Sequence, residues 1–182
     1  MLECNQSMGE AVDATPRSGC AINAAVEVLG DPWAILVLRD VMFGNRRYFR
    51  ELLVGSEEGI SSNILSSRLK QLTARGLLTR AEAKRGQRAK YSLTEAGIQV
   101  LPIMAALGTW GLAHREGDRR LRVRAELLRD AEPGYIDAMM DELREVHLGI
   151  PRPDPDSAKP SDRIQDAYER VIRAEEPWSG AV

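Results

Sequence analysis

Apolar residues recur every three to four positions along the first part of the chain, which is the spacing of the buried face of a helix. The first run covers residues 20–30 and stops at a glycine. The second run, 33–43, is apolar nearly all round, which predicts a helix buried at the centre of a domain. Asp31-Pro32 before it and Gly44-Asn45 after it are helix start and stop signals.

A short third helix is predicted over 46–55, and the helix after it combines an apolar side with a polar one. At 100° per residue, one side of the stretch 60–76 is apolar: Ile64, Leu65, Leu69 and Leu72. The opposite side and its flanks carry small or basic polar residues: Ser62, Asn63, Ser66, Ser67, Arg68 and Lys70. We expect Ser61 or Ser62 to cap this helix and Gly76 to end it.

Two strands, 77–84 and 89–94, are predicted next, around the turn "RGQR" at 85–88. Thr94 then caps a long helix, 95–116, with a kink near Pro102. The apolar positions of this helix cover a wider part of its surface than a single core-facing stripe would. We therefore expect a second burial partner, most economically a twofold copy of the same helix.

The remaining sequence predicts two amphipathic helices, a Pro-rich linker and a short last helix: 119–130, 133–149, 150–162 and 163–174. The whole pattern predicts a mainly α (α+β) fold, a winged helix-turn-helix domain with a two-stranded wing and extra C-terminal helices. The predicted organisation has four parts: a flexible N-terminal arm 1–19, a DNA-binding and dimerisation domain 20–116, a helical extension 117–149, and the linker with its terminal helix 150–182.

Charge separates the middle of the chain from its ends. The net charge is −2 for 182 residues, but residues 1–38 carry −4, residues 39–90 carry +7 and residues 91–182 carry −5. A basic block inside an acidic chain is typical of a nucleic-acid-binding module.

Composition points to a cytoplasmic protein. The N-terminus is acidic and lacks an apolar run, unlike a signal peptide, and the longest apolar segment, 98–113, is expected to be broken and too short to span a bilayer. Two cysteines do not make a disulfide scaffold. No spacing of His, Cys or acidic residues suggests a metal, no phosphate loop suggests a cofactor and no catalytic residues converge, so we expect no enzyme.

The polar helix and the basic turn together suit DNA recognition. Small side chains let a helix backbone approach the floor of the major groove, where Asn pairs with adenine and Lys or Arg with guanine. Arginines at a hairpin tip suit a narrow minor groove. The candidate DNA contacts are Arg46, Arg47, Ser61, Ser62, Asn63, Ser66, Ser67, Arg68, Lys70, Arg85, Gln87, Arg88 and Lys90. A winged helix used only for protein contacts is the alternative.

The string "C…LGDPW..LVLRDVMFG.RRYFREL…EGISSNILSSRLKQLTARGLL…R.KYSLTEAG" resembles the HxlR family of bacterial winged-helix transcription regulators, relatives of the MarR group. The resemblance covers about half the chain, roughly 20–111. It implies that 59–61 opens the recognition helix and that Arg88 is the wing arginine. It also implies a homodimer that pairs through its first and last helices and binds a pseudo-palindromic DNA operator. The simplest mode of regulation is repression, in which the bound dimer blocks the promoter.

The chain departs from the family pattern in three places. Ala21 replaces a common Pro, Gly86-Gln87 replaces a Pro-rich wing tip, and the extension after Gly117 is longer than in many relatives.

Two kinds of signal are open. Cys20 begins the first predicted helix, whose dipole favours a reactive thiolate, and in the resembling family a Cys at this place senses electrophiles or oxidants in some members. Cys20 is thus a redox-sensing candidate, with a Cys kept for packing as the alternative, and Cys4 is a weak candidate to resolve it. The rival is a small-molecule effector in an apolar pocket, with candidate residues Met104, Leu107, Trp110, Met139 and Met140.

Overall fold

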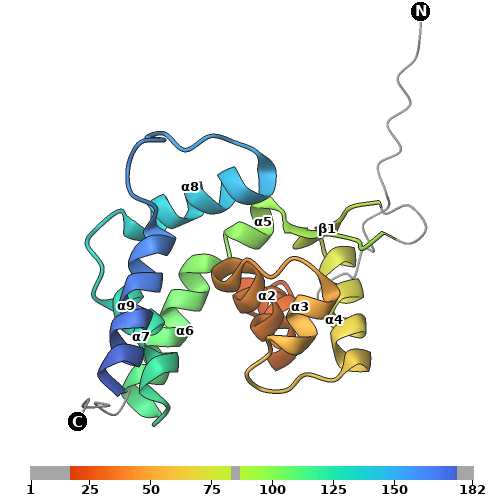
Figure 1. The fold of residues 1–182 in the computed structure, drawn as a ribbon. Helices are drawn as coiled ribbons and strands as arrows, with labels where there is room; N and C mark the ends of the chain where they lie inside the picture. The colour runs from red at the N-terminus through yellow and green to blue at the C-terminus, as the bar shows by residue number, and fades with distance from the viewer. Residues whose placement is uncertain (1–16, 83–86, 176–182) are drawn as a thin grey trace, which may run out of the picture. The chain divides into compact units, whose positions relative to one another are not determined.

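A computed structural model describes residues 17–82 and 87–175, which belong to two compact units that divide between Ser92 and Leu93 (Figure 1). The first unit contains α1 (Ala21–Leu29), α2 (Pro32–Gly44), α3 (Phe49–Val54), α4 (Ser62–Ala74), β1 (Leu78–Arg80) and β2 (Tyr91–Leu93), whose last residue lies past the division. The second contains α5 (Glu95–Ile98), α6 (Leu101–His114), α7 (Arg119–Arg129), α8 (Tyr135–Leu148) and α9 (Pro160–Glu175). The mainly helical α+β prediction is confirmed.

Helix α2 is the centre of the first unit, as its apolar sequence predicts. Ala34, Leu38 and Val41 have no measurable exposure. The Asp31 carboxylate accepts a hydrogen bond of 2.9 Å from the Ala34 N–H and caps the helix. At the other end Asn45 adopts φ 46°, a left-handed conformation that Asn tolerates and that ends the helix. Helices α3 and α4 pack against α2.

Helix α4 buries the leucine side that its sequence predicts. Leu65, Leu69 and Leu72 are at most 1% exposed. Of the two candidate caps the structure uses Ser61, whose hydroxyl accepts from the Ile64 N–H at 3.4 Å. Gly76, with φ 71°, lets the chain turn from α4 into β1.

The two strands are three residues each, shorter than predicted. Their pairing extends one residue beyond them through a bond of 2.8 Å from the Ala81 N–H to the Lys90 carbonyl. Residues 83–86 at the tip lie outside the described residues. A third segment joins from the α2–α3 connection: Tyr48 pairs with Lys90, and the Tyr91 N–H donates to the Arg47 carbonyl at 2.8 Å.

The Arg47 side chain completes this junction. It is 9% exposed, and its Nε donates to the Tyr91 carbonyl at 3.1 Å while its Nη2 donates to the Ser92 hydroxyl. Burial lowers the pKa of the guanidinium. The Arg47 side chain, expected to contact DNA phosphate, here ties the α2–α3 connection to the second wing strand.

The long helix expected over 95–116 is two helices, α5 and α6, that end at His114. The break falls at Gln99 and Val100, so Pro102 occupies the first turn of α6, where its missing N–H costs nothing. As predicted, Thr94 caps α5, accepting from the Gly97 N–H at 3.0 Å.

The stretch Glu95–His114 is long and apolar enough to cross a membrane. It has 20 residues and mean hydropathy 1.4, and 28% of its apolar window is buried. The expectation that this segment is too short for a span is therefore wrong on length, although length and hydropathy alone do not distinguish a span from a helix of a globular domain.

The C-terminal segment expected as a linker folds back on α8. Arg152 is 7% exposed, donates to the Pro155 carbonyl at 2.7 Å and lies 3.3 Å from a Glu145 carboxylate oxygen. The next helix, α9, begins at Pro160, three residues earlier than predicted, and lies beside α7 and α8 (Figure 1). The buried Glu142 accepts from the Ser161 N–H at 2.9 Å and fixes its start.

Replacing Arg47 by Met should destabilise the first unit. The change keeps an apolar stem of similar length but leaves the Tyr91 carbonyl without its guanidinium donor, which costs about 1–3 kcal/mol for a buried polar group. Urea unfolding should show this loss, together with faster hydrogen exchange at the Tyr91 amide. The control is Arg50→Met on the exposed face of α3. Equal stabilities of the two variants would contradict the structural role of Arg47.

Candidate nucleic-acid interface

The side of α4 opposite its buried leucines is an exposed polar surface. Ser62, Asn63, Ser67 and Lys70 are exposed on it, the Ser61 cap is exposed at its start, and Ser66 is half-buried at its edge. Apart from Lys70 these are short side chains, so the helix backbone can approach a groove floor closely. Asn and Lys at the centre of such a face are groups that recognise base edges.

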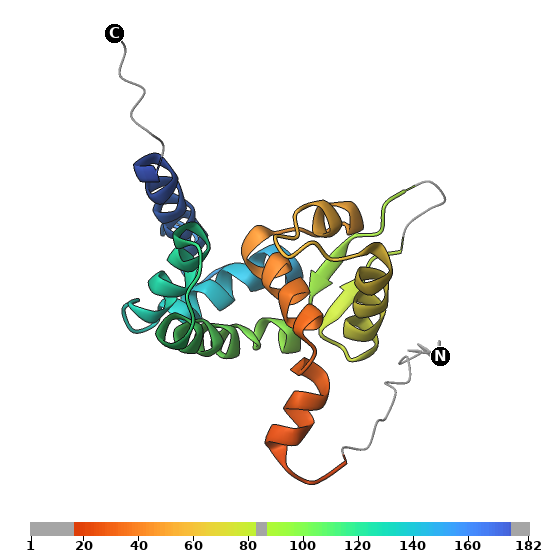
Figure 2. The same cartoon turned by 90° about the horizontal axis from the view of Figure 1, so that it is seen from below.

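The wing lies beside this helix in the first unit. Strand β1 packs against α4, and Figure 2 shows the two strands next to it. Gln87 and Arg88 are exposed and Lys90 is half-buried. Arg85 falls outside the described residues.

A charge network fixes the turn in front of α4. Arg39 on α2 makes two bonds to the Glu58 carboxylate, of 2.6 and 2.9 Å, and a further bond of 2.8 Å to Asp40. The hydrogen bonds from Arg39 lower the pKa of Glu58, more than its partial burial raises it. Asp40, 7% exposed, also lies 3.3 Å from a nitrogen of Arg46. Arg46 therefore enters the candidate surface half-buried and already paired.

Arg68 is also paired. Its Nε lies 2.7 Å from the Oδ1 of Asp31, and both side chains are 27% exposed. The first unit thus separates the predicted contacts into an outward set on α4 and the wing and an inward set, Arg47 and Arg68, engaged with the domain itself.

Sequence reasoning missed the residues that hold α4 in place. Asp31 was recognised only as a helix cap, and Arg39 and Glu58 were not singled out. Their pairings join residues 37 and 19 positions apart. The sequence signal for these pairings is weak: Arg39 is a charged residue inside the otherwise apolar sequence of α2.

Cys20 is exposed at the N-cap position of α1, as predicted. Helix α1 has no buried residue, and Ile22 and Val26 are 76% and 55% exposed. In Figure 2 this helix points away from α2, from which it is bent by 76°. Cys4 lies outside the described residues.

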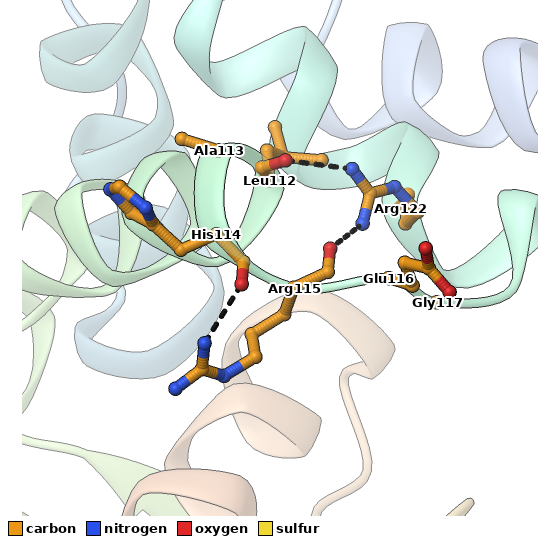
Figure 3. Close-up of a pocket in the computed structure, with 7 residues that line it drawn as sticks. All are labelled: Leu112, Ala113, His114, Arg115, Glu116, Gly117 and Arg122. Atoms are coloured by element: carbon orange, nitrogen blue, oxygen red, sulfur yellow. Dashed lines mark hydrogen bonds between the residues drawn. The ribbon is translucent and has the colours of Figure 1, made fainter.

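The five candidates for an apolar ligand pocket have different environments. Met104 and Met139 are buried, Met140 is half-buried, and Leu107 and Trp110 are 49% and 54% exposed. A pocket of about 790 Å³ lies instead at the end of α6, and it contains none of the five (Figure 3). There Arg122 donates to the carbonyls of Leu112 and Arg115, at 2.9 and 2.6 Å, and so provides hydrogen-bond donors for carbonyl groups at the C-terminal end of α6.

Among residues 17–82 and 87–175, no group of three His, Cys, Asp or Glu is placed to hold a metal ion.

Comparison with known proteins identifies relatives over the first part of the chain. The uncharacterized HTH-type transcriptional regulator MT3179 of Mycobacterium tuberculosis (strain CDC 1551 / Oshkosh) is 35% identical over 94 residues, 51% of this chain and 58% of that protein. The chain thus matches only 58% of the length of this relative. The uncharacterized HTH-type transcriptional regulator sll1512 of Synechocystis is 34% identical over 93 residues, 50% of this chain and 67% of that protein.

A solved structure shares the fold. PA1607, a protein proposed to be a transcription factor, is 28% identical, with a TM-score of 0.50 over 57% of this chain and 70% of its own. The model of the HxlR-like helix-turn-helix family matches residues 28–119, which span α2, the turn, α4, the wing and α6. That match takes in half of the sequence and agrees with the resemblance read from its motifs, so the chain belongs to the HxlR-like helix-turn-helix family.

Proposed function

We propose that this protein is a cytoplasmic, DNA-binding transcriptional regulator that acts as a homodimer, most simply as a repressor. The observation that carries the proposal is the exposed face of α4, where Asn63 and Lys70 stand among serines beside a basic wing. Family membership supports the same conclusion.

Each candidate contact has a distinct task in this proposal. Asn63 and Lys70 read base edges in the major groove. Ser61, Ser62, Ser66 and Ser67 let the helix approach closely and donate to phosphates. Arg88 and Gln87, with Arg85 and Lys90, bind the minor groove or its phosphates, and Arg46 adds a phosphate contact.

A homodimer would place two such helices on two half-sites about one helical turn apart. Two exposed apolar faces support this part of the proposal. One is Ile22 and Val26 on α1; the other is Ile103, Leu107 and Trp110 on α6, which are 42–54% exposed. Large apolar side chains at helical spacing on a surface indicate burial against a partner, and a copy of the chain satisfies both faces by symmetry.

The DNA-binding proposal is tested by selecting duplexes from random DNA with the chain and measuring the affinity of the selected site at several salt concentrations. A DNA reader should lose affinity steeply with salt, because each phosphate contact releases counterions. Asn63→Ala should cost about 1–3 kcal/mol at one base pair and relax the preference there. Arg88→Ala should instead weaken selected and random duplexes alike.

Thr79→Ala is the matched control, an exposed β1 residue outside the proposed contact set that should leave binding unchanged. Weak binding that ignores both salt and sequence would contradict the proposal and favour a winged helix used for protein contacts.

We infer further that modification of Cys20 switches the regulator. The thiol is exposed at the start of α1, next to an apolar face assigned to the dimer, so an adduct there would disturb α1 packing. Alkylation by N-ethylmaleimide should lower DNA affinity roughly 5- to 150-fold, the usual range of coupling between two sites. Cys20→Ser should bind DNA and lose the response, whereas Cys4→Ser should keep it. A response that persists in Cys20→Ser would move the switch elsewhere.

A further inference from the structure

Arg68 occupies a place on α4 that is neither core nor outward face. Leu65, Leu69 and Leu72 mark the buried side, and Asn63, Ser67 and Lys70 the exposed one. Arg68 lies on the flank between them and is directed to the start of α2, where its Nε meets Asp31 at 2.7 Å. The Nε of this cation is thus bound within the domain, while its Nη1 donates to the exposed Ser67 hydroxyl at 3.4 Å.

Asp31 performs two tasks with one carboxylate oxygen. Its Oδ1 accepts from the Ala34 N–H, which caps α2, and from Arg68. Burial raises the pKa of this carboxyl, but the bonds from Arg68 and Ala34 outweigh it and the net pKa is lowered. The carboxylate is therefore charged at neutral pH, and the pair is a charge-assisted hydrogen bond with a fixed geometry at its cap end.

A second pair holds the other end of the same contact. Asp31, at the start of α2, accepts from Arg68 in the middle of α4, whereas Arg39, further along α2, donates to Glu58 ahead of α4. Helices α2 and α4 also pack directly against each other, and both bury leucines. Apolar packing is not directional, so it resists separation of the two helices better than sliding or rotation of one on the other. The two ion pairs are directional and restrain these motions.

We propose that Arg68 is a positioning residue of the recognition helix rather than a DNA contact, and that Asp31 is the partner through which it acts. The proposal rests on the proposed function and refines it: the pair sets the angle at which α4 presents Asn63 and Lys70, and it keeps the Arg68 guanidinium from contacting phosphate. Recognition then depends on aligned base contacts more than on attraction to phosphate.

The expected size of the effect follows from the exposure of the pair. Half-exposed ion pairs of this kind contribute modestly, so loss of the pair should lower sequence discrimination by about threefold to fivefold. The salt dependence should be unaffected, because it counts phosphate contacts and Arg68 makes none in this proposal.

The experiment uses the full chain, the duplex that it selects and a scrambled duplex, each over a range of salt. Arg68→Met keeps the length of the side chain without its charge, and Asp31→Ser keeps a helix cap without its charge. Both should lower the ratio of the two affinities, with the salt slope of Arg68→Met at the wild-type value. Arg88→Met should lower the slope by about 0.9. Glu57→Gln, which removes a nearby exposed acid, should keep the ratio.

The outcomes separate the possible roles of Arg68. If Arg68→Met lowers the slope as much as Arg88→Met does, Arg68 contacts phosphate and the proposal is overturned. A loss of discrimination in Arg68→Met but not in Asp31→Ser would make Arg68 a direct base reader and also overturn it. Wild-type binding without dependence on salt or sequence would instead contradict the proposed function itself.

A second measurement needs no DNA. In urea unfolding, Asp31→Ser and Arg68→Met should each lower the free energy of unfolding. The double variant should be as stable as the less stable of the two single variants, because each single change already removes the pair. Strictly additive losses would show that the two residues do not act together and would overturn the proposal.

Discussion

Everything in the proposed DNA-binding function depends on how α4 is seated on α2. Leu65, Leu69 and Leu72 are buried beside a central helix that itself buries Ala34, Val37, Leu38, Val41 and Met42. This packing brings the small polar residues of the other side outward, because a helix that buries one side must expose the opposite one. Helix α2 is in turn fixed at its ends by the Asp31 cap and the left-handed Asn45. A change in α2 therefore reaches the DNA face through α4.

The sequence predicts those features that follow from local periodicity. The caps at Asp31, Ser61 and Thr94, the stop at Asn45 and the leucine side of α4 all depend on residues within one or two helical turns, and the structure contains each of them. The wing was predicted in the right place but too long. Only three residues of each strand pair regularly, and Ala, Glu and Lys have little tendency to extend a strand without a partner.

The side chains of the arginines could not be assigned in this way. Arg46 and Arg47 are adjacent in sequence, and both were expected to bind phosphate. Yet Arg47 is buried against β2 while Arg46 stays half-exposed beside Asp40. Nothing local distinguishes them, because the acceptors of Arg47 lie more than 40 positions away. For the same reason the sequence predicts a linker in the C-terminal segment: its prolines are visible in the sequence, but the contacts of Arg152 and Glu142 that fold it onto α8 are not.

The basic block of the sequence is consequently a poor measure of the charge that DNA would meet. Residues 39–90 carry a net charge of +7, but Arg39, Arg46 and Arg68 pair with carboxylates and Arg47 is buried. Pairing does not remove their charge from the long-range field, but it does fix where each guanidinium points, and burial limits the approach of Arg47 to phosphate. In the proposed function, a domain built in this way would attract DNA with its field and discriminate with a few oriented side chains. Because phosphate contacts dominate non-specific affinity, fewer of them would leave a larger share of the binding free energy to the base contacts proposed for α4.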